Sequence, residues 1–147
     1  MTNKAANHST FDTHYHVVFP VKYRKMLLTP RIDQAILDIA YQIAERYDIE
    51  FEAIGTDGDH IHLLCSFKPS LSGADVVRIF KSITARELFK QFPELRKELW
   101  GGELWSDGYY FATVGEKGDL AQIRTYVTMQ GKTQGHQLTL FGEGHGA

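Results

Sequence analysis

The sequence predicts an α+β protein, a ferredoxin-like βαββαβ sandwich in which two helices cover one face of a four-stranded antiparallel sheet. Two periodicities support this fold class: apolar residues alternate in the segments that read as strands and recur at helical spacing between them. The order of these segments along the chain supplies the topology. With 147 residues, 43% of them apolar, the chain is long enough to bury one full core.

The first half of the chain reads as strand, helix, strand. Residues 13–19, THYHVVF, alternate between a face of aromatic and valine side chains and a more polar face. Pro30 opens a helix to about residue 47, because isoleucines and alanines recur there at helical spacing. A second strand follows at 49–56. Asp57 and Gly58 then predict a two-residue hairpin turn, since both residue types tolerate positive φ.

The second half repeats the pattern and adds a helix. The third strand is 59–67, the second helix spans about 73–92, and the fourth strand is 109–114. Between the last two lies a glycine-punctuated loop that carries both tryptophans. Asp119 starts a final helix, with a glutamine three residues later as in a capping box, and the helix runs to about Gln130.

Composition limits the class of protein. The pattern gives one domain, residues 1–132, and a glycine-rich tail, 133–147. The net charge of −2, from 16 basic and 18 acidic residues, argues against a purely electrostatic nucleic-acid binder. The single cysteine, Cys65, excludes an internal disulfide and fits the cytoplasm. No apolar run approaches the roughly 18 residues that cross a bilayer, so no membrane partner is expected.

Histidines occur as pairs on the two strands that this topology makes central neighbours. His14 and His16 lie on the first strand, and His60 and His62 lie on the third. The opposite face of each strand is apolar, so all four imidazoles are expected on the open face of the sheet. Side chains two apart on a strand project in parallel, roughly 6.5–7 Å apart. Each pair could therefore converge on one metal ion, and imidazole suits manganese or zinc better than magnesium.

Several interpretations of such a pair compete. A histidine pair on a solvated sheet face is often plain polar surface. The two-histidine phosphoesterases need a hydroxyl residue two positions after each histidine, and neither pair has one. The HUH nucleases need two histidines that flank a bulky hydrophobic residue; His60-Ile61-His62 fits, and so does His14-Tyr15-His16. Alternation alone does not choose between the pairs, and all four histidines could also form a zinc site.

The last helix offers the other groups that an HUH enzyme uses. Such an enzyme attacks phosphorus with a tyrosine oxygen and often takes a third metal ligand from elsewhere. Tyr126 and Gln130 are four residues apart and therefore share a helix face. A separate apolar stripe, Leu120, Ile123 and Val127, would dock the helix. Taken alone, Tyr126 is better explained as a half-buried packing residue.

The chain resembles the single-tyrosine HUH transposases of the smallest bacterial insertion sequences, the IS200-like group. Five segments carry the resemblance, in the order and at the spacings of that family, and together they span about residues 11–132. They are YHVVFPVKYRK at 15–25, DHIHLL at 59–64, FKSITAR at 80–86, LWGGELW at 99–105 and YVTMQ at 126–130.

This resemblance implies a function and a set of site residues. His60, His62 and Gln130 would bind a divalent metal, Mg²⁺ or Mn²⁺, and Tyr126 would be the nucleophile. His16 would be structural or DNA-facing. The protein would act as a homodimer on single-stranded DNA with hairpins at the element ends, cleaving and rejoining it through a 5′-phosphotyrosine, with no small-molecule substrate. The alternative is a domesticated relative that binds hairpin DNA or RNA without transposing.

Candidate DNA contacts are basic or aromatic. The basic candidates follow the first strand or lie on the second helix, where a solvated surface is the competing explanation. They are Lys22, Arg24, Lys25, Arg78, Lys81 and Arg86. Trp100 and Trp105 would stack on unpaired bases or pack within the core or a dimer.

Overall fold

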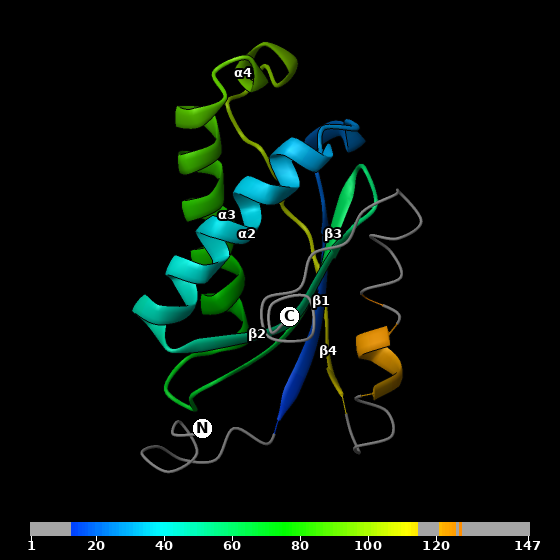
Figure 1. Ribbon diagram of the computed structural model, residues 1–147, viewed down its shortest axis with the longest axis vertical. Coiled ribbons are helices and arrows are strands. Elements are labelled where there is room, and N and C mark those ends of the chain that lie inside the picture. The colour runs from blue at the N-terminus through cyan, green and yellow to red at the C-terminus, as the bar shows by residue number, and fades with distance from the viewer. Residues whose placement is uncertain (1–12, 115–120, 126, 128–147) are drawn as a thin grey trace.

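The computed structural model describes residues 13–114, 121–125 and 127, and its centre is a four-stranded antiparallel sheet (Figure 1). The strand order is β2-β3-β1-β4. The strands are β1 (His14–Pro20), β2 (Ile49–Thr56), β3 (His60–Phe67) and β4 (Tyr110–Val114). β1 pairs with β3 and β4, and β3 pairs with β2. The predicted topology, with the first and third strands as central neighbours, is confirmed.

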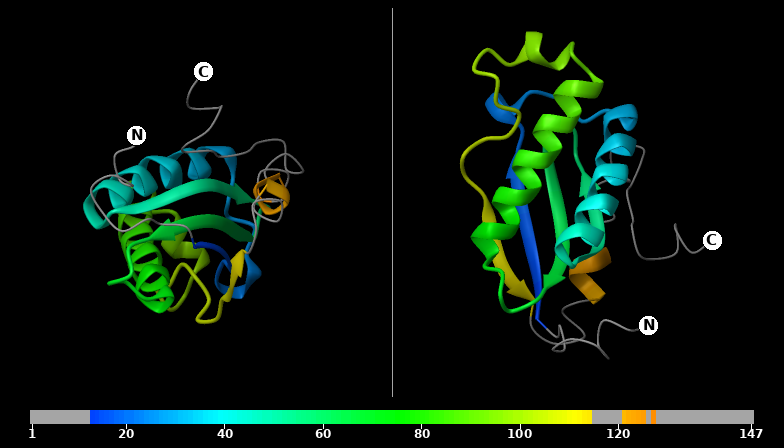
Figure 2. Two further views of the ribbon diagram at one scale, coloured as in Figure 1. Left: turned by 90° about the horizontal axis from the view of Figure 1, so that it is seen from below. Right: turned by 90° about the vertical axis from the view of Figure 1, so that its left-hand side faces the viewer.

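Two long helices cover one face of the sheet, α2 (Pro30–Tyr47) and α3 (Gly73–Gln91) (Figures 1 and 2). The side chain of Thr29 accepts a hydrogen bond from the backbone of α2, and Pro30 occupies the first turn. Ser72 and Asp75 form a capping box at the start of α3. Both helices begin where the apolar periodicity predicts. Among the described residues, no helix is long and apolar enough to cross a membrane.

Two short elements went unpredicted, η1 (Lys22–Arg24) and α4 (Leu95–Glu98), because three or four residues are too few to show a period. The predicted turn residues, Asp57 and Gly58, are displaced by one position. The amide of Asp57 donates to the carbonyl of His60 over 3.0 Å, so the hairpin closes on Gly58 and Asp59. Of the three residues between β2 and β3, only Gly58 has a positive φ, 79°.

The main core lies between the sheet and the two helices. Phe19 on β1, Phe51 on β2 and Phe80 on α3 are fully buried and meet edge to face. A buried side chain of this size contributes about 1.5–3 kcal/mol. Trp105 closes this core beside Phe19, and its indole N–H donates to Thr84 Oγ1 over 2.9 Å. Of its two predicted roles, Trp105 therefore takes the packing role.

A β-bulge at Glu52 changes which side chains of β2 face the helices. Phe51 pairs with Cys65, but Ala53 pairs with Leu64, so Glu52 is the inserted residue. An inserted residue reverses the alternation that follows it. Ala53 accordingly lies in an open-face cluster and Gly55 faces Val127, whereas the Thr56 hydroxyl donates to buried Asp33 on α2 over 2.8 Å. Burial raises the pKa of Asp33 to about 7.

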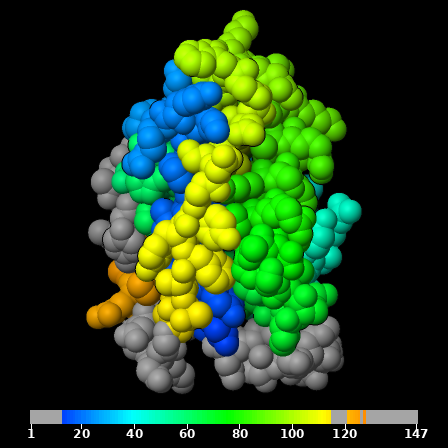
Figure 3. Space-filling model, turned by 180° about the vertical axis from the view of Figure 1, so that it is seen from behind, coloured from blue at the N-terminus to red at the C-terminus, as the bar shows by residue number. Residues whose placement is uncertain are grey.

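The other face of the sheet carries a smaller apolar cluster beneath the last helix (Figure 2). Residues 121–125 and 127 are helical, in agreement with the predicted helix, and the remainder of that helix lies outside the described residues. Ala53, Leu64, Val114 and Val127 are buried together, with Ile123 packed against them. β4 forms one edge of the sheet and runs along the surface beside α3 (Figure 3).

Candidate active site

The four histidines separate into a group of three and a single residue. The rings of His60 and His62 on β3 lie 5.0 Å apart between centroids, and His16 on β1 stacks on His62 at 5.4 Å. His14 instead contacts Glu52, the bulge residue, with 2.8 Å between its Nδ1 and Oε1. The open face thus joins His16 to the predicted metal-binding pair and leaves His14 in a separate contact with Glu52.

His62 is buried and neutral. Its Nδ1 shares a 3.2 Å hydrogen bond with Nε2 of His16. Burial, together with the neighbouring His60 and His16, lowers the pKa of His62 to about 3, and burial also lowers the pKa of His16. Both rings are therefore uncharged near neutral pH, the form that binds metal. His62 lines an open pocket with His16, Val18, Tyr110 and Ile123, so the last helix forms part of its wall.

His60 is held by a carboxylate. Its Nδ1 lies 2.7 Å from Oδ1 of Asp59, whose Oδ2 accepts a 3.1 Å hydrogen bond from Nε of Arg24. Burial alone would raise the pKa of Asp59, but the hydrogen bonds from His60 and Arg24 hold it below its usual value. A second carboxylate, Oδ2 of Asp57, lies 3.9 Å from Nε2 of His60.

This arrangement fits a metal at the Nε2 atoms of His60 and His62. Each ring has its Nδ1 engaged by a neighbouring group, Asp59 for His60 and His16 for His62. Metal-binding histidines in proteins usually make such a second contact, which fixes the ring and its tautomer. Sequence reasoning assigned His16 no definite part, and nothing in the spacing HYH indicates that it supports the other pair.

The four-histidine zinc site is not supported. Within the described ranges, no group of three or more His, Cys, Asp or Glu side chains could hold a metal ion. His14 is engaged with Glu52 away from the other three. Two imidazoles alone leave a site short of ligands, so further donors must come from other residues or from a substrate. Tyr126 and Gln130, the predicted nucleophile and third ligand, lie outside the described residues, and their roles stay predictions.

Most of the basic candidates form ion pairs at the surface. The nitrogen–oxygen distances range from 3.0 to 3.7 Å. The pairs are Lys22–Glu103, Arg24–Asp59, Lys25–Glu98, Arg78–Asp75 and Arg86–Glu87. Exposed pairs of this kind contribute about 0–1 kcal/mol and exchange readily. A DNA phosphate could therefore compete for these cations, and their predicted role stays a prediction.

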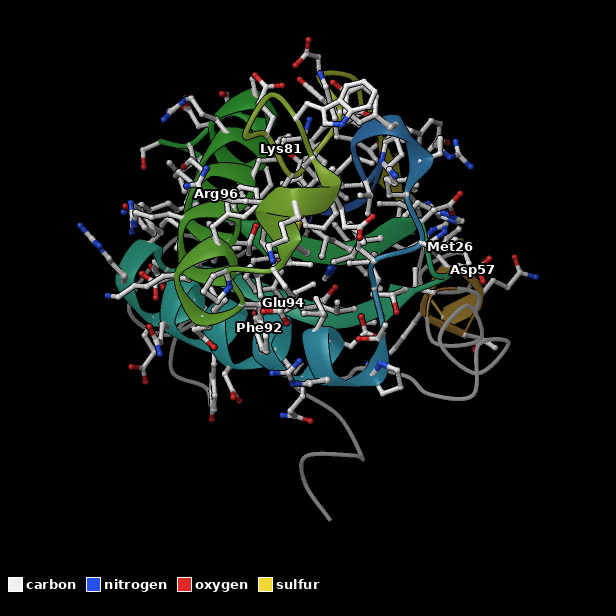
Figure 4. The ribbon with its side chains drawn as sticks, turned by 90° about the horizontal axis from the view of Figure 1, so that it is seen from above. Met26, Asp57, Lys81, Phe92, Glu94 and Arg96 are labelled. Carbon is white, nitrogen blue, oxygen red and sulfur yellow. The ribbon has the colours of Figure 1, made fainter. Side chains whose placement is uncertain are left out.

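Lys81 has an internal role. Its ammonium group donates to the backbone carbonyls of Ser106, Asp107 and Gly108, at 3.2 Å for the last two. It also lies over the rings of Phe19 and Tyr109. Figure 4 labels Lys81 on α3, beneath the loop before β4. These contacts account for Lys81 without DNA.

Trp100, unlike the buried Trp105, lies at the surface. Trp100 is 86% exposed, and its ring lies 5.6 Å from that of Tyr23, which is 51% exposed. Lys22 sits over the Tyr23 ring. Sequence reasoning named Trp100 but missed Tyr23, because a tyrosine in a short basic turn carries no sign of being exposed. We refer to Tyr23 and Trp100 as the aromatic pair.

A four-stranded sheet covered by helices on one face is a fold that this chain shares with solved transposases. A crystal structure of a transposase from Deinococcus radiodurans R1 superposes with a TM-score of 0.67 at 31% identity, covering 88% of this chain and 98% of that one. A REP-associated tyrosine transposase bound to a REP hairpin superposes with a TM-score of 0.61 at 13% identity, over 92% and 75% of the two chains, and that likeness concerns the fold alone.

Sequence comparison identifies the family. The family model described as "Transposase IS200 like" matches residues 9–130. The ISDra2 transposase TnpA of Deinococcus radiodurans is 35% identical over 120 residues, 82% of this chain and 85% of the relative. A transposase for insertion sequence element IS200 from Salmonella typhimurium is 27% identical over 139 residues, 93% and 90% of the two chains. The chain belongs to the IS200-like transposase family.

Proposed function

We propose that this transposase is a metal-dependent endonuclease and strand transferase for single-stranded DNA. Tyr126 is the nucleophile, His60, His62 and Gln130 bind Mg²⁺ or Mn²⁺, and the active form is a homodimer. Family membership supports transposition. The observation that carries the proposed chemistry is the pair of histidines on β3, each with Nδ1 engaged and Nε2 as the candidate ligand atom.

The proposed reaction is a transesterification in two steps. The Tyr126 oxygen forms a bond to phosphorus as the bond to the 3′ oxygen breaks, which leaves a 3′-hydroxyl and a 5′-phosphotyrosine. The phenol, with an ordinary pKa of about 10, gives up its proton and the departing 3′ oxygen gains one. A second 3′-hydroxyl then reverses the step and joins a new partner strand. A divalent cation at the histidines offsets the negative charge that develops on the phosphate.

A ligand set of two imidazoles and one amide carries no charge, so we expect the free protein to bind Mg²⁺ or Mn²⁺ weakly. The phosphate of bound DNA would supply the negative oxygen ligand that magnesium prefers. His60 and His62 are poised for this role because their Nδ1 contacts fix the rings before any substrate arrives.

We also infer that the substrate strands carry hairpins. Support comes from the resemblance of the sequence motifs and from the REP-associated tyrosine transposase, whose solved structure holds a REP hairpin. The cations of the turn after β1 and of α3 are the candidate backbone contacts, and Lys22 lies over the Tyr23 ring of the aromatic pair.

Incubation of the protein with labelled single-stranded element ends and Mn²⁺ or Mg²⁺ should give a covalent protein–DNA adduct that survives denaturing electrophoresis. The adduct should disappear with EDTA and should not form on the same sequence annealed to its complement. Hairpin binding without any adduct, at all metal concentrations tested, would favour the domesticated binding relative and reject the enzymatic proposal.

Trp100 offers a second test, of base stacking on the aromatic pair. Stacking of an unpaired base should quench the emission of exposed Trp100, while Trp105, which is 4% exposed, acts as an internal reference. We expect Trp100→Ala to abolish the quenching by single strands and to weaken their binding by about 5- to 150-fold, the loss of one stacked base. Met26→Ala, on an exposed residue of the same turn region, is the control. Equal quenching by duplex DNA would contradict stacking.

A further inference from the structure

The turn that follows β1 holds an unusual backbone conformation. Tyr23 and Arg24 have φ values of 61° and 54°, in the left-handed region that non-glycine residues rarely occupy. Each such residue costs about 1–3 kcal/mol and persists only where its surroundings enforce it, often at functional sites. Here the surroundings are the hairpin loop: the amide of Val21 donates to Asp59 O over 2.8 Å, and the amide of Leu28 donates to Gly58 O over 2.9 Å.

These backbone bonds place the turn against the Asp57–Asp59 loop, and one side chain completes the connection. Nε of Arg24 donates to Oδ2 of Asp59 at 3.1 Å, and Oδ1 of the same carboxylate lies 2.7 Å from Nδ1 of His60. Each carboxylate oxygen therefore has one partner. Figure 4 shows Met26, two residues beyond Arg24, on the same side of the molecule as Asp57.

We propose that Arg24 is a positioning residue that acts through Asp59 to fix the ring and the tautomer of His60. A carboxylate only accepts hydrogen bonds, so it selects the imidazole with its proton on Nδ1 and its lone pair on Nε2. Arg24 holds the second oxygen and stops the carboxylate from rotating. The inference rests on the proposed function, because it takes His60 to be a metal ligand.

Stability does not explain the contact. The Arg24 side chain is 65% exposed, and an ion pair so exposed contributes little to folding. The backbone hydrogen bonds hold the turn against the loop without the Arg24 side chain, whereas orientation of a ligand is a gain in metal affinity. The sequence prediction for Arg24 was a DNA phosphate contact, and the two roles differ in whether Asp59 is needed.

Nitrogen-15 NMR of the metal-free protein gives a readout that does not depend on activity. His60 should show an unprotonated Nε2 in the wild type, and Asp59→Asn and Arg24→Ala should both shift it towards a mixture of tautomers. Titration with Mn²⁺ alone can be monitored by the broadening of the His60 and His62 resonances. The Mn²⁺ affinity should be lower by about 10- to 100-fold in Asp59→Asn and by a smaller factor in Arg24→Ala. The Mn²⁺ affinity of the double variant should equal that of Asp59→Asn, because both substitutions break the same link from Arg24 through Asp59 to His60.

Arg31→Ala is the matched control. Arg31 is 70% exposed and pairs with Glu94 at 3.3 Å, and Figure 4 shows Glu94 apart from Asp57. It should leave the tautomer and the Mn²⁺ affinity unchanged. A wild-type tautomer in Asp59→Asn, or additive effects of Arg24→Ala and Asp59→Asn, would overturn the inference. No Mn²⁺ broadening at His60 and His62 in the wild type, even with DNA, would instead reject the proposed metal site and leave the tautomer result standing.

Discussion

Replacement of Tyr126 by phenylalanine should abolish the covalent adduct with single-stranded DNA. The substitution removes one oxygen atom, and that atom is the proposed nucleophile, so adduct formation should fall by about 10⁴-fold or more. Hairpin binding should stay within about twofold of the wild type, because the aromatic ring and the basic surface are unchanged. The measurements are denaturing electrophoresis for the adduct and a mobility shift for binding.

Two further tyrosine variants sharpen this test. Tyr110→Phe examines the rival nucleophile, because Tyr110 is exposed and lines the pocket with His16 and His62. Tyr41→Phe is the matched control, an exposed tyrosine on α2, across the sheet from that pocket. We expect adducts from both variants. An adduct that persists in Tyr126→Phe and vanishes in Tyr110→Phe would reassign the nucleophile to β4.

Helices and strands with a periodic pattern of apolar residues could be predicted from the sequence, and these elements determine the fold. Strand alternation placed His60 and His62 on the open face and Ile61 and Leu63 in the core, as the structure has them. The boundaries of α2 and β2 were also correct, because Pro30 and the turn residues mark them. Such features depend on local geometry, which is determined by the residues of one segment alone.

Features that depend on one inserted residue or one distant partner could not be predicted. Nothing in the sequence of β2 indicates the bulge at Glu52. Because of this bulge, Gly55 faces the last helix. Lys81 was predicted to contact DNA, and its carbonyl partners could not be foreseen because they lie 25 to 27 residues away. The link from Arg24 to Asp59 needs two left-handed residues, which no propensity would assign to tyrosine and arginine.

The bulge has a predicted consequence for catalysis, because Gly55 lies against Val127, the residue that follows Tyr126 in the sequence. A Cβ atom built on Gly55 would stand 1.9 Å from the carbonyl oxygen of Val127, the residue after Tyr126. Val127 is fully buried against Ala53, Leu64 and Val114. The clash is with backbone, so no rotation of a side chain relieves it, and the helix must move away from β2.

Gly55→Ala should therefore slow adduct formation by about 100-fold, the cost of a displacement of about 1 Å in a reacting group. Hairpin binding should be kept, since α3 lies on the opposite face of the sheet and no basic side chain is changed. Gly101→Ala is the matched control, because a Cβ atom there meets nothing within 4 Å. Thermal unfolding of both variants separates helix displacement from loss of the fold. If Gly55→Ala forms the adduct at the wild-type rate, the contact between Val127 and β2 does not set the position from which Tyr126 reacts. Tyr126 would then react elsewhere, for example in the active site of the partner subunit.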